Sequence, residues 1–209
     1  MSIASQNDLA QQLFQLLVAG EEHACKQLIF DAYKFGRTQV QAVCAALASA
    51  FHKIGDAWEC SKIDTYTEHV ASQIGHRVLL DLRSRLPKSS PSGPKAIGCT
   101  AEKDPYSLPT MMVELVLREL GWEASSLGTN LPLELLEPAL DNMQPELCWV
   151  SVSYVASMPR LKQQLSHLGR IADMKGIQVI CGGQAIDEYM IREVPHLTYL
   201  PDLALLHQL

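Results

Sequence analysis

The spacing of apolar residues changes abruptly near residue 90, and this change constrains the fold more than any other feature of the sequence. Residues 87–94 read Pro-Lys-Ser-Ser-Pro-Ser-Gly-Pro, a composition typical of a linker. Before this segment, apolar residues recur every three or four positions, as in helices. After it, short apolar runs alternate with helical stretches. The sequence therefore predicts two domains, residues 1–86 and 95–209, joined by a linker at 87–94.

The first domain has the pattern of a four-helix bundle, with helices expected at 6–18, 20–35, 37–57 and 63–86. One apolar stripe runs along the third helix and is made of Val40, Val43, Leu47, Phe51, Ile54 and Trp58. The fourth helix has an apolar face and, beside it, a polar one made of Thr65, Glu68, His69, Ser72 and His76. This polar face is either a solvated surface or a site, and the pattern alone leaves both open.

The second domain reads as alternating strands and helices. Strands are expected at 95–100, 122–127, 147–153, 177–181 and, briefly, near 197–200, and helices at 107–120, 132–143, 159–175 and 184–193. Gly121 and Gly176 follow two of these helices, where a C-cap glycine is typical. Such alternation predicts a five-stranded parallel sheet covered by helices on both faces, with ligands at the carboxyl ends of the strands.

Small and polar residues gather at those carboxyl ends. The first strand is followed by Asp104-Pro-Tyr106-Ser-Leu-Pro109, the third ends Ser151-Val-Ser153, and the fourth ends Gly182-Gly183. Each motif alone is ordinary loop chemistry, but their spacing resembles that of the cobalamin-binding domain family. The signature of that family is Asp-x-His-x-x-Gly, then Ser-x-Leu, then Gly-Gly. Gly128, in Leu-Gly-Thr-Asn-Leu-Pro, is similar to the second strand–helix loop of the family.

The helical half extends the resemblance. Trp58 is followed ten residues later by Glu68-His69 and then Ser72, which resembles the helical cap of light-responsive, cobalamin-dependent MerR-type regulators. The DNA-binding domain that those regulators carry upstream has no counterpart in this sequence. In such a cap, Trp58 would lie against the upper side of the corrin ring. The alternative is that Trp58 is a core residue of the apolar stripe on the third helix.

The resemblance implies a helical cap followed by a flavodoxin- or Rossmann-like α/β domain, with adenosyl- or methylcobalamin as cofactor. The resemblance also implies a set of cofactor-binding residues, at the positions that match the motifs of the family. They are Trp58, Glu68, His69, Ser72, Asp104, Tyr106, Gly128, Ser151, Ser153, Gly182 and Gly183. The nucleotide tail of cobalamin would lie beside Ser151, Ser153, Gly182 and Gly183, because their small side chains leave room for it.

The sequence departs from the family at its chemical centre. Tyr106 stands where the family places the histidine that ligates cobalt, Pro109 stands at the glycine, and Ser153 replaces the leucine of Ser-x-Leu. A neutral phenol is a poor cobalt ligand. Three outcomes follow: cobalamin without a protein ligand below the metal, cobalamin ligated by His69 from the cap, or a fold that has lost the corrinoid.

Charge, hydropathy and cysteine content indicate which partners and which cellular environment to expect. The net charge of −6 lies entirely in residues 95–209, which predicts no direct binding of nucleic acid. No apolar run is long enough to span a membrane, and the N-terminus does not resemble a secretory signal. Six isolated cysteines predict buried free thiols in a reducing, cytoplasmic environment.

Three functions are therefore considered, in this order. The first is a cobalamin-binding sensor or regulator, responsive to light or to the cofactor, whose output is a change of oligomeric state or of protein partner. The second is a degenerate fold that has lost cobalamin and binds another ligand or a protein. The third is a corrinoid carrier in methyl transfer. No nucleophile–base pair or phosphate-binding loop is present, so we expect the chain not to be an enzyme.

Overall fold

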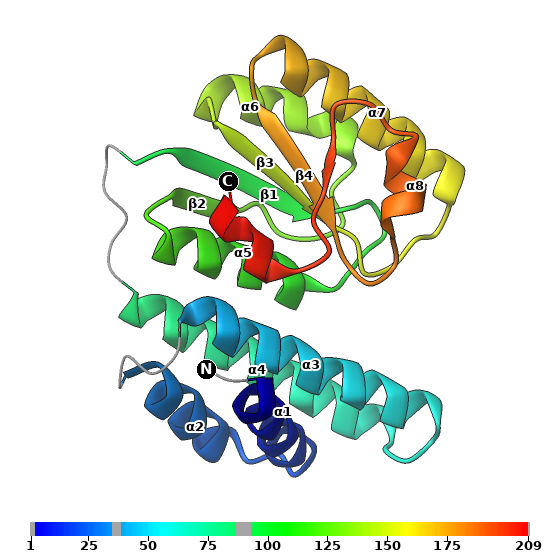
Figure 1. Cartoon of the computed structure of the whole chain (residues 1–209). Helices are drawn as coiled ribbons and strands as arrows, with labels where there is room; N and C mark the ends of the chain where they lie inside the picture. Colours follow the sequence, from blue (N-terminus) through cyan, green and yellow to red (C-terminus); the bar gives the residue numbers. More distant parts are fainter. Residues whose placement is uncertain (1–2, 35–38, 87–92, 209) are drawn as a thin grey trace. The chain divides into compact units, whose positions relative to one another are not determined.

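The computed structural model describes residues 3–34, 39–86 and 93–208, which form two compact units that divide between Leu86 and Pro87. Residues 87–92 of the predicted linker lie outside the described residues. The first unit is a bundle of four helices, and the second is a five-stranded parallel sheet flanked by helices (Figure 1). This confirms the expected fold class.

The helical unit consists of α1 (Ile3–Val18), α2 (Glu22–Lys34), α3 (Val40–Glu59) and α4 (Thr65–Arg85). Most of the predicted stripe of α3 is buried, but Trp58 at the end of that helix is 47% exposed. The core alternative for Trp58 is therefore wrong, because nearly half of its surface is exposed in the last turn of α3. Asp64 caps α4 by accepting the N–H of Thr67 (2.7 Å).

Ion pairs join α2 to α4 on the surface of the bundle. The carboxylate of Glu22 lies 2.8 Å from both Lys26 Nζ and an Arg77 guanidinium nitrogen, and Lys26 also pairs with Asp81. The hydrogen bonds from Arg77 and Lys26 lower the pKa of Glu22 from 4.5 to about 2.

The sheet of the α/β unit has the order β2-β1-β3-β4-β5, with every pair parallel. Its strands are β1 (Lys95–Thr100), β2 (Glu123–Ser126), β3 (Leu147–Ser151), β4 (Gln178–Gly182) and β5 (Thr198–Tyr199). Strand β3 ends two residues before the prediction, because the N–H of Ser153 turns away from the sheet to bind Asp104.

Helices cover both faces of the sheet (Figure 1). One face packs against α5 (Ser107–Glu119) and the terminal 3-10 turn η2 (Leu203–Gln208), and the other packs against η1 (Leu133–Leu136), α6 (Glu137–Met143), α7 (Met158–Met174) and α8 (Glu188–Arg192). The predicted helix 132–143 is thus a 3-10 turn followed by a short α-helix that begins beside Pro138. The predicted helix 184–193 begins only after Asp187, its N-cap.

A tryptophan fills the interior beneath α5. Trp149 of β3 is paired with Gly98 of β1, is 1% exposed, and donates its indole N–H to Thr110 Oγ1 of α5 (2.9 Å). A Cβ on Gly98 would lie 2.0 Å from the indole ring. Glycine at this position is therefore required by the size of its neighbour.

Five of the six cysteines are buried as predicted, and burial raises the pKa of Cys25 to about 11 and that of Cys99 to about 12. Cys60 is the exception: it is exposed, because it caps the C-terminus of α3 beyond the core. None of the described helices combines the length and apolar character needed to cross a bilayer.

Gly98→Ala should destabilise the α/β unit, because the new methyl group would overlap the buried indole of Trp149. We expect the free energy of unfolding in urea to fall by about 1–3 kcal/mol, the usual cost of overpacking a core. Gly55→Ala is the control, since Gly55 lies within α3 and a Cβ there meets nothing within 4 Å. An equal loss in both variants would contradict this packing.

Glu22→Gln should reduce the acid sensitivity of the helical unit. The folded-state pKa of Glu22 lies below its value of 4.5 in the unfolded chain, so its ion pairs stabilise the unit above pH 4.5 and this stabilisation is lost as the pH falls towards 2. We expect hydrogen exchange in α2 and α4 to rise less between these pH values in the variant than in the wild type. Glu21→Gln, at an exposed neighbour, should behave as the wild type.

Candidate functional site

One buried carboxyl group joins the loops at the carboxyl edge of the sheet. Asp104, in the loop after β1, is fully buried, and its Oδ2 accepts the N–H groups of Ser153 (2.6 Å) and Tyr154 (3.2 Å) from the loop after β3. Its Oδ1 accepts the N–H of Tyr106 (3.0 Å). Burial raises the pKa of Asp104, and the three N–H bonds oppose that rise.

The backbone carbonyl of Asp104 reaches the third loop of this edge. It accepts the hydroxyl of Thr100 (2.7 Å) and the N–H of Asn130 (3.1 Å), which follows β2. Asn130 in turn accepts the N–H of Lys103 at its Oδ1 (2.7 Å). The predicted site residue Asp104 therefore acts in this structure as a brace among three loops, with both carboxyl oxygens occupied by the backbone of its own chain.

Aromatic and apolar side chains are exposed around this brace. The ring of Tyr106 is 52% exposed, although its N–H is held by Asp104. Tyr154, after β3, and Leu127, after β2, are exposed as well. Exposed apolar and aromatic side chains therefore lie on the loops of the carboxyl edge, and Tyr106 is one of them. Its role in binding a ligand stays a prediction.

The other predicted residues of this unit lie at the same edge in different settings. Gly128 has a positive φ of 95°, and a Cβ there would meet nothing within 4 Å. Ser151 is buried at the end of β3, and Ser153 is half-buried and held through its N–H by Asp104. The topology brings these residues together with Tyr106 at one edge, as expected for parallel strands.

Backbone of the chain itself lies close to Gly182 and Gly183. A Cβ on Gly182 would lie 2.2 Å from the carbonyl oxygen of Leu200, and a Cβ on Gly183, whose φ is 131°, would lie 2.2 Å from that of Val152. Packing within the chain is therefore sufficient to require glycine at both positions. The expectation that they also leave room for a nucleotide tail stays a prediction.

The predicted residues of the helical unit also lie together. The indole N–H of Trp58 donates to the hydroxyl of Thr65 (3.2 Å) at the start of α4, and Ser72 donates its hydroxyl to Glu68 Oε1 (2.9 Å) one turn further along that helix. The side chain of His69 is 73% exposed, and its Nε2 lies 3.8 Å from Glu68 Oε2. Burial lowers the pKa of His76 on the same helix.

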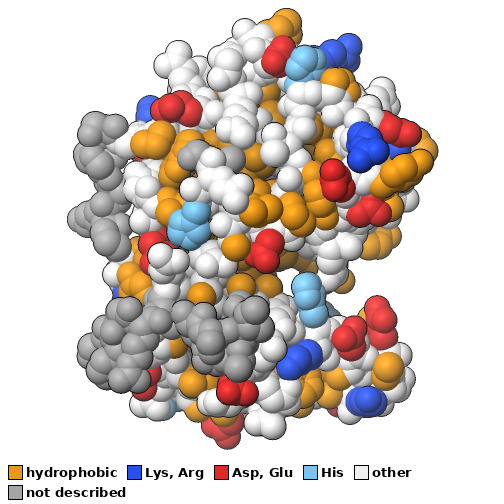
Figure 2. Space-filling model, viewed as in Figure 1, with side chains coloured by type: hydrophobic (Ala, Val, Ile, Leu, Met, Phe, Trp, Pro, Cys, Tyr) orange, Lys and Arg blue, Asp and Glu red, His pale blue; other side chains and the backbone are white. Residues whose placement is uncertain are grey.

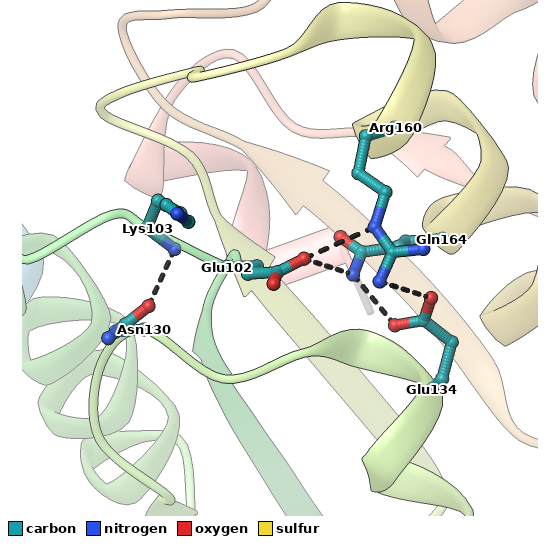
Figure 3. Close-up of polar contacts among 6 residues, drawn as sticks. All are labelled: Glu102, Lys103, Asn130, Glu134, Arg160 and Gln164. Carbon is teal, nitrogen blue, oxygen red and sulfur yellow. Dashed lines mark hydrogen bonds and ion pairs between the residues drawn. The ribbon is translucent and has the colours of Figure 1, made fainter.

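A polar cluster that the sequence reasoning missed ties the loop after β1 to α7 (Figure 3). Gln164, which is buried, donates through Nε2 to Glu102 (2.8 Å) and to Glu134 of η1 (2.7 Å). Arg160 pairs with the same two carboxylates at 3.3 and 3.0 Å. The available signal was the i, i+4 spacing of Arg160 and Gln164 at the start of a helix, with glutamates in two neighbouring loops.

The described residues contain no group of three histidine, cysteine or acidic side chains placed to hold a metal ion. On the face seen in Figure 2, the described Lys and Arg side chains are scattered among acidic and apolar ones and form no continuous stripe. The prediction that the chain does not bind nucleic acid stays a prediction.

Comparison with known proteins gives one family match. Residues 9–80 match the family described as the B12 binding domain. This segment includes Trp58, Glu68, His69 and Ser72 and covers most of the helical unit. It confirms the expected class of cofactor. A search of curated proteins gave no match.

Solved structures with a similar fold include the monomethylamine corrinoid protein of Methanosarcina barkeri, which is 18% identical over 94% of each chain with a TM-score of 0.77. A cobalamin-binding protein from Desulfitobacterium hafniense DCB-2 is 16% identical over 93% of each chain, with a TM-score of 0.47. The methanol:cobalamin methyltransferase complex MtaBC from Methanosarcina barkeri is 17% identical over 94% of this chain and 76% of that chain, with a TM-score of 0.48. The first likeness shows a shared fold, and none of these findings supports the closer resemblance to light-responsive regulators.

The residues at the carboxyl edge fit one part of cobalamin and not another. The exposed rings of Tyr106 and Tyr154 suit a wide, mostly apolar corrin disc. The four loops that follow β1 to β4 contain no histidine to ligate cobalt from below. Backbone oxygens lie where a Cβ on Gly182 or Gly183 would be, so the chain itself requires these two glycines.

Asp104→Asn should destabilise the α/β unit even without any ligand. An amide nitrogen at the place of either carboxyl oxygen would face backbone N–H groups and leave at least one of them unpaired. We expect a loss of about 2–4 kcal/mol in the free energy of unfolding in urea, the cost of one or two buried unpaired donors.

Asp187→Asn is the matched control, because Asp187 is an exposed N-cap of α8 that accepts one N–H from Met190. Asn caps helices about as well as Asp, so this variant should change stability by no more than about 0.5 kcal/mol. A loss at Asp104 as small as that of the control would contradict the role of the brace.

Proposed function

We propose that this protein is a corrinoid carrier, which binds cobalamin and presents it to a protein partner that performs the chemistry. The observation that carries the proposal is the match of residues 9–80 to the B12 binding domain, which takes in all four site residues predicted in the helical unit. The shared fold with a corrinoid protein over 94% of both chains supports it. Of the three functions considered from the sequence, we therefore now favour the corrinoid carrier. The sensor, which came first there, is no longer favoured because no comparison supports it.

The proposed cofactor is cobalamin held without a protein histidine below the cobalt. Tyr106 occupies the expected position of that ligand, and its exposed phenol is a poor donor to cobalt at neutral pH. His69 is the imidazole that remains among the predicted site residues, but it lies on the surface of α4 beside Glu68. Water or the benzimidazole of cobalamin itself is then the lower ligand.

The partner is proposed to be a methyltransferase, by analogy with the methyltransferase complex among the similar structures. As a carrier, this chain would itself not be an enzyme, as the sequence predicted. The apolar carboxyl edge with Tyr106 and Tyr154 is the surface that would hold the corrin ring in this role.

A second candidate is the cofactor-free module, and one observation favours it. Asp104 and the two glycines are fully accounted for by contacts within the chain, so these three residues need no ligand to explain them. The match to a B12 binding domain weighs against this candidate.

The test is equilibrium dialysis of the purified chain against adenosyl-, methyl- and hydroxocobalamin, with an absorption spectrum of the bound cobalamin. We expect saturable binding and a spectrum that is unchanged in Tyr106→Phe and in His69→Ala, because neither side chain ligates cobalt. His52→Ala, at an exposed histidine on α3, is the matched control.

Two results would contradict this account. A spectrum altered by His69→Ala and not by His52→Ala would assign the cobalt ligand to His69. If no cobalamin is retained by the protein in equilibrium dialysis, even at high concentrations, the carrier would be excluded and the cofactor-free module favoured.

A further inference from the structure

The sheet face that packs against α5 carries the residues along which a nucleotide tail was expected to pass. Alternate residues of β3 point to opposite faces, and Val150 and Val152 belong to the core on the α7 side. Trp149 and Ser151 therefore face α5, which the bond from the Trp149 indole to Thr110 verifies. Gly182 is paired with Ser151 in the neighbouring strand and lies on the same face.

The interior on this face is filled by a rigid aromatic ring. The indole of Trp149 lies directly over Gly98, where even a Cβ would approach to 2.0 Å. Thr110 accepts its N–H and also lies 3.2 Å, Oγ to Oγ, from Ser126 of β2. The ring is thus held between β1 and α5, with Thr110 in turn beside Ser126 of β2, and Trp149 is 1% exposed.

Backbone segments lie close to Gly182 and Gly183 at the end of β4. The carbonyl of Leu200, which follows β5, lies against Gly182, and its N–H is held by the carbonyl of Cys181 (2.8 Å). The loop after β4 is fixed in the same way, because Val152 donates its N–H to Gly182 (2.8 Å) and accepts that of Ala185 (3.1 Å). The backbone around both glycines is therefore held in place, and the ring of Trp149 is the part of this interior that a single substitution can remove.

Resting on the proposed function, we propose that Trp149 occupies the room that the lower nucleotide would need, so that the protein binds corrinoids irrespective of that nucleotide. The base of this nucleotide in cobalamin is a benzimidazole, a bicyclic aromatic ring of nearly the same size as indole. Trp149 fills the interior with an equivalent ring from the protein itself. The corrin is then bound at the surface, and the nucleotide stays in solvent.

The test compares cobalamin with cobinamide, which lacks the nucleotide, on the full chain in excess cyanide. Both cobalts then carry two cyanide ligands, and only the nucleotide differs between the two probes. We expect dissociation constants within about threefold of each other, since no protein contact distinguishes the probes. Dicyanocobalamin bound at least about tenfold more tightly than dicyanocobinamide would overturn the inference and leave the proposed function intact.

Trp149→Ala tests the role of the ring directly. The variant opens the interior over Gly98, so we expect it to bind dicyanocobalamin about tenfold more tightly than dicyanocobinamide. Trp122→Ala, at the amino end of β2, should keep the ratio of the wild type. An unchanged ratio in a folded Trp149→Ala protein would overturn the assignment to Trp149.

Trp149→Leu, which keeps more of the packing, replaces the alanine variant if circular dichroism shows that the latter is unfolded. It should shift the ratio in the same direction, and an unchanged ratio would again overturn the assignment. A wild type that binds neither probe, nor any cobalamin in the absence of cyanide, would overturn the proposed function and the inference together.

Discussion

The carboxyl group of Asp104 holds the functional edge of the α/β unit in one conformation. Three backbone N–H groups from two loops converge on its two oxygens, and its own carbonyl ties in the third loop through Thr100 and Asn130. A buried carboxyl needs such partners, because an unpaired one would cost several kcal/mol, on the order of 2–5. The bonds to their N–H groups fix the backbone at Tyr106 and Tyr154.

A second constraint is the size of the Trp149 side chain, which determines the residues that can lie next to it in the core. Gly98 must be glycine to admit the indole, and Thr110 must accept its N–H. The polar cluster around Gln164 has the corresponding role on the other side of the sheet, where it fixes Glu102 and Glu134 to α7 (Figure 3). Both faces of the sheet are thus packed by contacts within the chain.

The sequence was sufficient to predict the fold because its periodicity is local and consistent. Helical spacing up to Arg85 and alternation from Lys95 onward gave four helices and five parallel strands in nearly the observed positions. The predicted motifs at Asp104, Ser151 and Gly182 did converge at one edge, since the carboxyl ends of parallel strands must do so.

The roles of those residues could not be predicted in the same way, because they depend on contacts far apart in the chain. Asp104 meets Ser153 across 49 residues, and Gly182 is crowded by the carbonyl of Leu200, which no local pattern reveals. In the sequence, Trp149 is one apolar residue of a predicted strand. Only its pairing with Gly98 in the sheet shows that its ring occupies the space beside that glycine. The spacing of Trp58 continued a core stripe, but in the structure this residue lies in the last turn of α3 with nearly half of its surface exposed.

The central claim is that the protein binds cobalamin without a protein nitrogen on the cobalt. Electron paramagnetic resonance of cob(II)alamin bound to uniformly ¹⁵N-labelled protein tests this claim most directly, because a nitrogen ligand splits the cobalt signal according to its isotope. The account predicts only the triplet splitting of ¹⁴N, from the benzimidazole of cobalamin, or no nitrogen splitting at all. Doublet splitting from ¹⁵N would show that a histidine of the protein ligates cobalt and would contradict the account.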